Sequence, residues 1–301
     1  MLHEHMAPIW DGSSEERYAQ VSCFLPVDST LGVEDIYTFR EKLNGKLLEI
    51  SLEAEDGKSL YVDAYSAKSQ LTLRNKDRVA NVTALGVNED YFFFHNLLLR
   101  SGSYLTSWDV MQDRVVLDEN TAWTLFGSFD VAGMEVTIDN RPFVVAGVVK
   151  RNSDPASKLA EADSPSIVYV DYSLIQDSAA ISCYEIVMPS PLSDYAKATV
   201  EELFPLGQSG EIIENSSRFR MDRIAGLFFS QGERMMQHSG IAYPSWENAA
   251  RYQETKMGWL LLGMFFFALL PASLLVLLLI LLYCRLHRYV KQKILERRIS
   301  A

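Results

Sequence analysis

Metal-ligand side chains lie close together at the start of this chain. His3, Glu4 and His5 are neighbours, but the other histidines are scattered through the sequence. A protein metal site takes several ligands that the fold brings to one point, and the sequence offers no second cluster that could complete this one. The sequence therefore predicts no metal site.

A group of carboxylates between residues 109 and 119 could imitate a catalytic acid pair. Asp109, Asp113, Asp118 and Glu119 have the chemistry of a general acid and base, but a solvated turn beside a strand explains them as well. The chain has no Gly-x-Ser-x-Gly phrase around a nucleophile and no Gly-x-x-x-x-Gly-Lys-Ser/Thr phosphate loop. We therefore predict that the chain is not an enzyme and needs no cofactor, and that any ATP hydrolysis belongs to another subunit.

One segment is long and apolar enough to cross a membrane. Met257 to Cys284 contains no Asp, Glu, Lys, Arg or His over 28 residues. A helix needs about 20 apolar residues to span a bilayer. The sequence predicts a single transmembrane helix here, with a kink at Pro271.

The charges on the two sides of this segment predict its orientation. Six basic residues and one glutamate follow Cys284, whereas the flank at 247–256 carries two basic and two acidic residues. Lys and Arg next to a membrane helix stay on the cytoplasmic side, so we expect a cytoplasmic C-terminus and an extracytoplasmic domain before the helix. The 22 basic and 38 acidic residues before Arg285 give that domain a net charge of −16, which excludes electrostatic binding to nucleic acid.

The N-terminal residues show no leader. The phrase MLHEHMAPIW has no basic region followed by an apolar stretch, so it is not typical of a signal peptide or an anchor. Because a large domain must still cross the membrane, we expect an upstream hydrophobic segment that this sequence lacks.

The pattern of alternating and helical apolar residues predicts an α+β domain. A strand at 17–25 and a helix at 33–43 are followed by short strands, at 47–56, 59–67, 69–75 and 80–87. A β-rich block at 89–154 comes next, with strands at 113–119 and 135–149, a helix at 119–127, and an aromatic run at 91–94 that is either core or an exposed patch. Strands at 166–175 and 183–189 and a helix at 194–204 then repeat the opening pattern.

This order predicts a split α/β domain that carries an inserted β-rich subdomain, followed by a helical stalk, a membrane helix and a basic tail. The first half of the domain is expected at 1–88, the insertion at 89–154 and the second half at 155–217. The stalk follows at 218–256, the membrane helix at 257–284 and the cytoplasmic tail at 285–301.

The segment from Ala84 to Val149 resembles the MacB-type periplasmic core domain of ABC transporter permeases, the group that includes MacB-like and FtsX-like proteins. Four phrases occur in the family's order: LGVNEDYFFFHNLLLRSGSYLTSWD with Gly102 and Asp109, a helix ending in Leu125, Phe126 and Gly127, the turn from Asp130 to Gly133, and the strand end at Val145 to Val148. Tyr18 to Pro205 fits the family's porter-like plan, and YPSWENAARYQE resembles the entry to its second transmembrane helix.

The resemblance implies a permease-type subunit whose extracytoplasmic domain is coupled mechanically to ATP hydrolysis by a separate cytoplasmic ATPase, together with further permease subunits. The family's permeases have a membrane helix before the core domain and at least two more after the one seen here. This chain departs from that pattern, because it shows neither. The alternative is a single-pass anchored binding or scaffold protein without transport activity.

The three cysteines, Cys23, Cys183 and Cys284, are too few for a disulfide-built scaffold. Cys23 and Cys183 fall in strands of the two separated halves of the expected domain, where they could form a disulfide or stay buried as free thiols. Cys284, at the membrane boundary, is either a palmitoylation site or a filler residue at a helix end.

The tail RLHRYVKQKILERRIS continues the membrane helix without Gly or Pro and has one apolar side. Its basic residues fit an anchor on anionic lipid headgroups. The family resemblance implies a second role, contact with the ATPase subunit through Tyr289, Val290, Ile294 and Leu295.

Overall fold

The computed structural model describes residues 7, 17–50, 59–106, 108–162, 164–207, 209–227 and 240–299, with the side chains at 222, 290 and 292–299 left out. The strands are β1 Tyr18–Phe24, β2 Val62–Asn75, β3 Arg78–Val87, β4 Leu99–Gly102, β5 Arg114–Asp118, β6 Glu135–Ile138, β7 Arg141–Val149, β8 Ile167–Asp171, β9 Cys183–Pro189 and β10 Glu211–Glu214. The helices are α2 Val33–Glu49, α3 Tyr91–Phe94, α4 Glu119–Phe126, α5 Pro155–Ala160, α6 Tyr195–Leu203, α7 Met221–Leu227 and α8 Ser245–Ile299, with 3₁₀ turns η1 Tyr172–Leu174 and η2 Asn215–Ser217. This is the mixed α+β composition that the sequence predicts.

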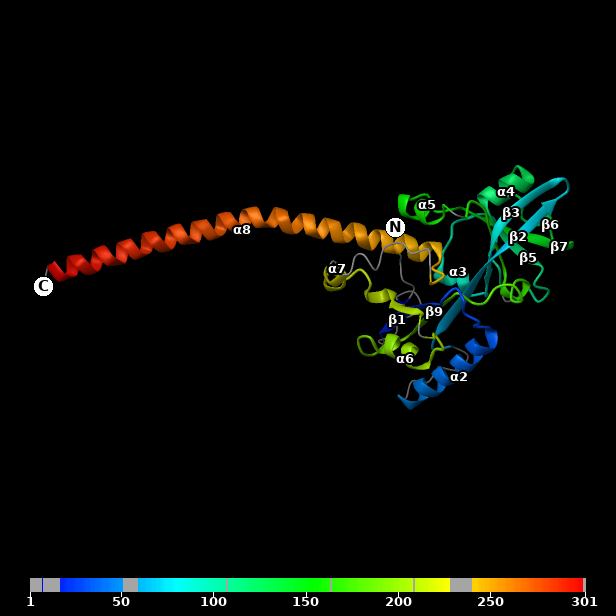
Figure 1. Cartoon of the computed structure of the whole chain (residues 1–301), viewed down its shortest axis with the longest axis horizontal. Helices are drawn as coiled ribbons and strands as arrows, with labels where there is room; N and C mark the ends of the chain where they lie inside the picture. The colour runs from blue at the N-terminus through cyan, green and yellow to red at the C-terminus, as the bar shows by residue number, and fades with distance from the viewer. Residues whose placement is uncertain are drawn as a thin grey trace.

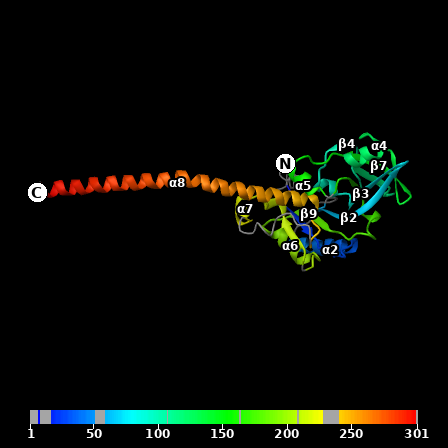
Figure 2. The same ribbon diagram turned by 45° about the horizontal axis from the view of Figure 1, so that its top comes forward.

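The strands form one sheet in the order β10-β1-β9-β2-β3-β8-β5-β7-β4, with β6 paired to β2 and β7. The long β2–β3 hairpin joins two lobes, and Figures 1 and 2 show α2 and α6 with β1 and β9 in one lobe and α4 with β7 in the other. The largest core cluster combines buried residues of α2, α4 and α6 with one face of the sheet. A second cluster on the other face includes α3, so apolar side chains are buried on both faces.

The sheet does not break where the sequence places the end of the insertion. β8 follows residue 155, yet it pairs with β3 in parallel and with β5 in antiparallel orientation. The predicted second half therefore contributes a strand, β8, to the lobe that contains α4 and β7. Hydrogen bonds connect the strands of both lobes into one sheet. The division of the chain into separate units stays a prediction.

Four of the expected strands differ from the structure. The strand at 47–56 is wrong at its start, since α2 continues to Glu49, and 51–58 lie outside the described residues. The two short strands at 59–67 and 69–75 form the single strand β2. The strand at 135–149 is the hairpin β6–β7, which turns at Asp139 and Asn140 with φ of 48° and 62°, the left-handed pair that a tight hairpin turn needs.

The aromatic run at 91–94 forms α3 and belongs to the core. Tyr91, Phe92 and Phe94 are buried, and Phe92 stacks on Tyr104 with ring centroids 4.7 Å apart. The interpretation as core is confirmed, because these rings fill the cluster on the α3 face of the sheet.

Cys23 and Cys183 lie on neighbouring strands but do not form a disulfide. Both are buried free thiols, and in the register of β1 and β9 Cys23 lies opposite Tyr184 while Cys183 lies opposite Phe24. Successive residues of a strand point to opposite faces, so the two sulfur atoms are on different sides of the sheet. They also belong to different core clusters. This arrangement fits the free-thiol alternative, and the pairing of the two cysteines stays a prediction.

Helix α8 leaves the domain as one long rod (Figure 1). It begins at Ser245 and continues through Pro271 to Ile299 over 55 residues, so the last part of the expected stalk, 245–256, and the membrane helix are a single element. Figures 1 and 2 show a gentle curve along its length. Of the expected stalk, residues 228–239 lie outside the described part of the chain.

Candidate functional site

The apolar part of α8 is exposed over most of its length. The described part of the chain contains one helix with the length and composition to cross a membrane, Ser245–Tyr289; its most apolar stretch of 18 residues has a mean hydropathy of 2.9 and is not buried. Leu270 and Leu274 are 68% and 55% exposed. Because water strongly disfavours this much apolar surface, Met257 to Cys284 requires a lipid environment.

The first three turns of the same helix are buried in the domain and carry ionised side chains. Glu247, Arg251 and Glu254 lie at spacings of four and three residues, which places them on one helix face. They are 0%, 1% and 4% exposed. The base of α8 packs against α5 and α7, and this contact region, which we call the joint, connects the membrane helix to the sheet.

Arg218, just before α7, is the centre of the joint. Its Nη1 and Nη2 donate to the two carboxylate oxygens of Glu247 at 2.5 Å and 2.9 Å, and its Nε donates to Glu254 at 2.6 Å. Paired contacts of this kind fix the relative orientation of the two side chains as well as their distance. Arg218 therefore connects two turns of α8 to the η2–α7 segment.

Arg251 extends the same group to the edge of the sheet. Its Nε donates to Glu247 at 2.8 Å, and its Nη2 donates to Glu211 of β10. The Tyr243 hydroxyl also donates to Glu211, at 2.5 Å, while the Arg251 guanidinium lies 3.9 Å from the Tyr243 ring centroid. Two arginines and three glutamates thus join α8 to both β10 and α7.

The electrostatics of the joint keep Glu247 ionised. Burial by itself would raise the pKa of this carboxyl, but Arg218 and Arg251 outweigh burial and hold the pKa below its usual value. The carboxylates of Glu247 and Glu254 raise the pKa of Arg218, although burial by itself would lower it. The group is therefore a set of mutually dependent charges, and removing one member leaves another buried without its partner.

Aromatic and polar side chains continue the joint into the sheet. The Trp246 ring lies 5.5 Å from Phe24 of β1 and 5.0 Å from the His95 ring, between centroids. His95 Nε2 is 2.5 Å from a carboxylate oxygen of Glu185 on β9, and Ser22 of β1 donates to the same carboxylate at 3.1 Å. The start of α8 therefore contacts β1 directly and β9 through His95.

The residues that the sequence proposed for contact with an ATPase lie far from the joint. Tyr289 is 57% exposed and is 38 residues beyond Arg251, about 57 Å along a helix. Val290, Ile294 and Leu295 belong to the same helix, but their side chains lie outside the described ones. The role of these four residues stays a prediction.

Asp109 and Asp118, two of the four acidic residues between 109 and 119, have structural partners. Asp118 caps α4 by accepting a hydrogen bond from the Thr121 amide at 2.7 Å, and Arg151 lies 3.5 Å from its other oxygen. Asp109 lies 3.8 Å from Arg114. Within the described ranges, no group of three or more His, Cys, Asp or Glu side chains is arranged to hold a metal ion.

Sequence reasoning missed the joint, although part of its pattern is visible in the sequence. Glu247, Arg251 and Glu254 entered the prediction only as charges flanking the membrane segment, whereas their spacing places them on one helix face. Arg218 is 29 residues before Glu247 and belongs to a different element, so its pairing depends on the tertiary fold.

The comparisons with known proteins agree with the order of elements. The family model for the MacB-like periplasmic core domain matches residues 28–201, from just before α2 into α6. The chain belongs to this family. The match confirms the resemblance predicted from the phrases between Ala84 and Val149, and it covers most of the sheet on which the joint is built.

Curated relatives share only part of their length with the chain. The macrolide export ATP-binding/permease protein MacB of Neisseria gonorrhoeae is 30% identical over 126 residues, which cover 38% of this chain and 19% of that protein. The protein of the same name from Aggregatibacter actinomycetemcomitans is 36% identical over 86 residues, covering 28% and 13%.

Two solved structures are also similar. The periplasmic region of MacB from Actinobacillus actinomycetemcomitans aligns with a TM-score of 0.45 at 22% identity, covering 66% of this chain and 89% of that one. The extracellular domain of the noncanonic ABC-type transporter YknZ from Gram-positive bacteria aligns with a TM-score of 0.43 at 18% identity, covering 64% and 99%.

Proposed function

We propose that this chain is a permease-type membrane subunit of an ABC transporter complex, whose extracytoplasmic domain moves as a separate cytoplasmic ATPase hydrolyses ATP. Membership of the MacB-like family supports this class of function. The observation that carries the mechanical part is the joint, in which a buried group of charges holds the domain on a helix that continues without a break into its apolar segment.

A continuous helix can transmit a displacement that a flexible linker would absorb. Helix α8 extends from Ser245 to Ile299, over about 82 Å at 1.5 Å per residue. At its base, Arg218 and Arg251 bind Glu247 from two sides. A tilt of the apolar segment should therefore rotate the domain, because the helix is continuous from the joint into the apolar segment.

The orientation of α8 is part of the proposal. The basic residues after Cys284 favour a cytoplasmic C-terminus, and the acidic domain before the helix then lies outside the cytoplasm. A protease added outside intact cells should reach the polar linker at 155–165, while a tag after Ala301 should stay protected.

The tail is proposed to contact the ATPase through Tyr289, Val290, Ile294 and Leu295. Docking of a helix depends on a few apolar anchors, whereas lipid binding depends on summed charge. Replacing Val290 and Ile294 by Ser should therefore abolish copurification of the ATPase and leave membrane insertion intact. If the ATPase is retained with this variant, the tail is only an anchor.

The mechanical proposal is tested by softening α8 at the end of the joint that lies next to the apolar segment. Replacing Gln253 and Lys256 by Gly weakens the helix, because each Gly costs about 1 kcal/mol relative to Ala, and neither residue belongs to the buried charge group. The same two positions changed to Ala are the matched control. All three chains are placed in nanodiscs with the copurified ATPase, with a donor dye on Asp77→Cys at the β2–β3 turn and an acceptor on the lipid headgroups.

Addition of ATP should change the energy transfer between the β2–β3 turn and the membrane in the parent chain and in the Ala variant. The Gly variant should keep the ATPase bound but lose most of this change. An equal response in all three chains would contradict coupling through α8. If no ATPase copurifies with the parent chain, the single-pass anchored binding or scaffold protein is the better account.

A further inference from the structure

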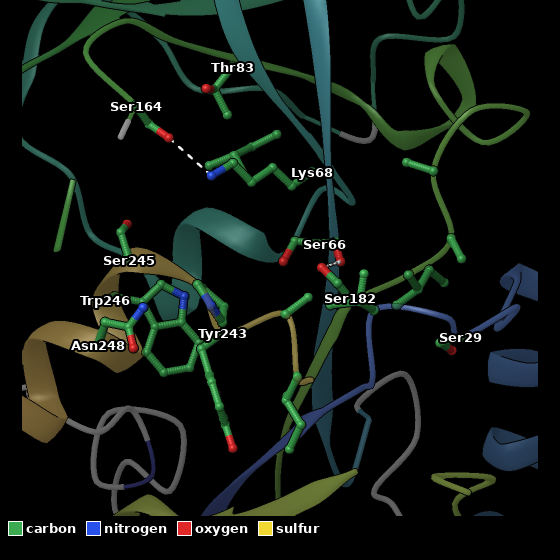
Figure 3. Close-up of a pocket in the computed structure, with 18 of the residues that line it drawn as sticks. Ser29, Ser66, Lys68, Thr83, Ser164, Ser182, Tyr243, Ser245, Trp246 and Asn248 are labelled. Atoms are coloured by element: carbon green, nitrogen blue, oxygen red, sulfur yellow. Dashed lines mark hydrogen bonds between the residues drawn. The ribbon is translucent and has the colours of Figure 1, made fainter. Parts of the chain in front are cut away.

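A cavity of about 690 Å³ opens between the sheet and the base of α8. Figure 3 shows Lys68 and Thr83 at one end of the cavity; at the other end lie Tyr243, just before α8, and Trp246 and Asn248 of α8. This volume is in the range of small-molecule sites in proteins. The buried charge group of the joint does not use the cavity, although the two share the start of α8.

Hydroxyl groups dominate the polar lining of the cavity. They come from β2, β3, the loops around residues 29, 164 and 178–182, and the start of α8: Ser29, Ser66, Thr83, Ser164, Ser178, Ser182 and Ser245. A hydroxyl can donate and accept, so such a wall suits a ligand that itself carries several hydroxyl groups.

Lys68 supplies the one charged side chain among the described residues that line the cavity. Its Nζ donates to the Ser164 hydroxyl at 3.0 Å, and within the described part of the chain it has no carboxylate partner. An ammonium has three donors, so further donors are available to a ligand. Although the domain as a whole is strongly acidic, the Lys68 ammonium can bind one anionic group here.

Asn248 adds a buried polar atom with no partner. The side chain is 7% exposed and lines the cavity, and its Oδ1 accepts no hydrogen bond from the described residues. Leaving such an atom unsatisfied costs about 1 to 3 kcal/mol, which a ligand hydroxyl would recover. Trp246 and Tyr91 provide flat apolar walls nearby.

We propose that this cavity binds a small, hydroxyl-rich, sugar-like solute that carries one phosphate or carboxylate group. Lys68 and Ser164 hold the anionic group, the serine hydroxyls and Asn248 bind the hydroxyl groups, and the Trp246 ring packs against an apolar face of the ligand. Because Ser245 to Asn248 belong to α8, the bound solute connects the sheet to the membrane helix. Binding does not depend on the proposed transport function.

The test uses the full chain in phosphatidylcholine nanodiscs and glucose 6-phosphate as the probe. The fluorescence of Trp246 should change in a saturable way, and the Trp246→Phe variant identifies its share of the signal. Lys68→Gln should weaken binding by about tenfold or more, because a hydrogen bond to a charged group contributes about 1.5 to 3 kcal/mol. Lys68→Arg should retain most of the affinity, and Lys42→Gln on α2 is the matched control that should change nothing.

Two further probes separate the contribution of the sugar from that of the phosphate, and a third tests the source of the ligand. Glucose and inorganic phosphate should each bind at least about tenfold more weakly than glucose 6-phosphate, since each lacks half of the proposed contacts. Nanodiscs with phosphatidylinositol test whether the same chemistry comes from a lipid headgroup, in which case the lipid reduces binding of the soluble probe. Retained soluble binding in these nanodiscs assigns the site to a free solute.

Equal affinity for glucose and glucose 6-phosphate, or unchanged binding by Lys68→Gln, would overturn the proposal. So would the absence of a saturable response to both glucose 6-phosphate and phosphatidylinositol. Copurification of the ATPase is measured separately, so a failure of this site is distinguishable from a failure of the proposed transport role.

Discussion

Helix α8 contains two regions that meet opposite solvation requirements. Between Ser245 and Lys256 it buries charged side chains in the domain, and each of these buried charges is paired. Between Met257 and Cys284 it exposes large apolar side chains and carries no charge at all. Specific side-chain partners therefore hold the base in place, whereas the stability of the span depends on an apolar surrounding. The two regions should respond differently to substitution.

The largest expected effect is a charge placed in the exposed span. Replacing Leu270 and Leu274 by Asp puts two carboxylates near the middle of the apolar segment, at a cost of about 5 to 7 kcal/mol for insertion. The double variant should be lost from the membrane fraction after alkaline extraction, whereas the same positions changed to Ala should stay in it. Retention of the Asp variant would show that this segment does not lie in lipid.

The second effect is a buried charge left without its partner. Arg218→Gln leaves Glu247 and Glu254 buried beside a neutral side chain, which should cost about 3 to 5 kcal/mol of unfolding free energy. Urea unfolding followed by Trp fluorescence measures this loss. The control is Arg223→Gln, whose ion pair with Asp194 is 2.6 Å long but largely exposed and should contribute at most about 1 kcal/mol. Equal losses in the two variants would contradict a special role for burial.

The third effect is the pH dependence of the joint. Because the pKa of Glu247 is lowered in the folded chain, its ionised form stabilises the fold above the unfolded-state pKa of about 4.3, and this contribution is lost as the pH falls through the folded pKa. The melting temperatures of the parent chain and of Glu247→Gln should therefore differ by a constant amount above about pH 5 and converge at lower pH. A difference that grows as the pH falls would reverse the sign of this argument.

The smallest effect compares the buried thiols of the sheet with the thiol at the end of the span. Burial raises the pKa of Cys23 and of Cys183, so both should resist a thiol reagent in the folded chain, while the half-buried Cys284 should react sooner in detergent. In denaturant without reductant all three should react, because Cys23 and Cys183 point to opposite faces of the sheet. Labelling of Cys284 alone under those conditions would indicate a disulfide between the other two.

Part of this architecture could be predicted from the sequence. The span was evident because an uncharged run of 28 residues exceeds the length that a bilayer-spanning helix needs, and the ordered phrases between Ala84 and Val149 identified the family. The single strand β2 was missed because Lys68 and Ser69 interrupt its alternation. The place of β8 was missed because its partners, β3 and β5, are set by the fold rather than by its own residues.

The joint and the cavity were harder to predict for the same reason. Arg218 and Glu211 reach α8 only in three dimensions, and nothing in the local pattern around either residue marks it as a partner of Glu247 or Arg251. Lys68 likewise lines one cavity with Ser164 and Asn248, which belong to elements distant in sequence. Local patterns can show which faces are apolar or charged, whereas the pairing of those faces depends on topology.

Hydrogen exchange at the base of α8 is the decisive measurement for the attachment of the helix to the domain. In nanodiscs, the amides from Ala249 to Lys256 should exchange as slowly as those of β1 and β9, because this part of the helix opens only when the joint opens. Arg218→Gln should accelerate their exchange, and Arg223→Gln should not. Exchange of these amides at the rate of an unstructured peptide, unchanged by Arg218→Gln, would contradict the attachment of α8 through the joint.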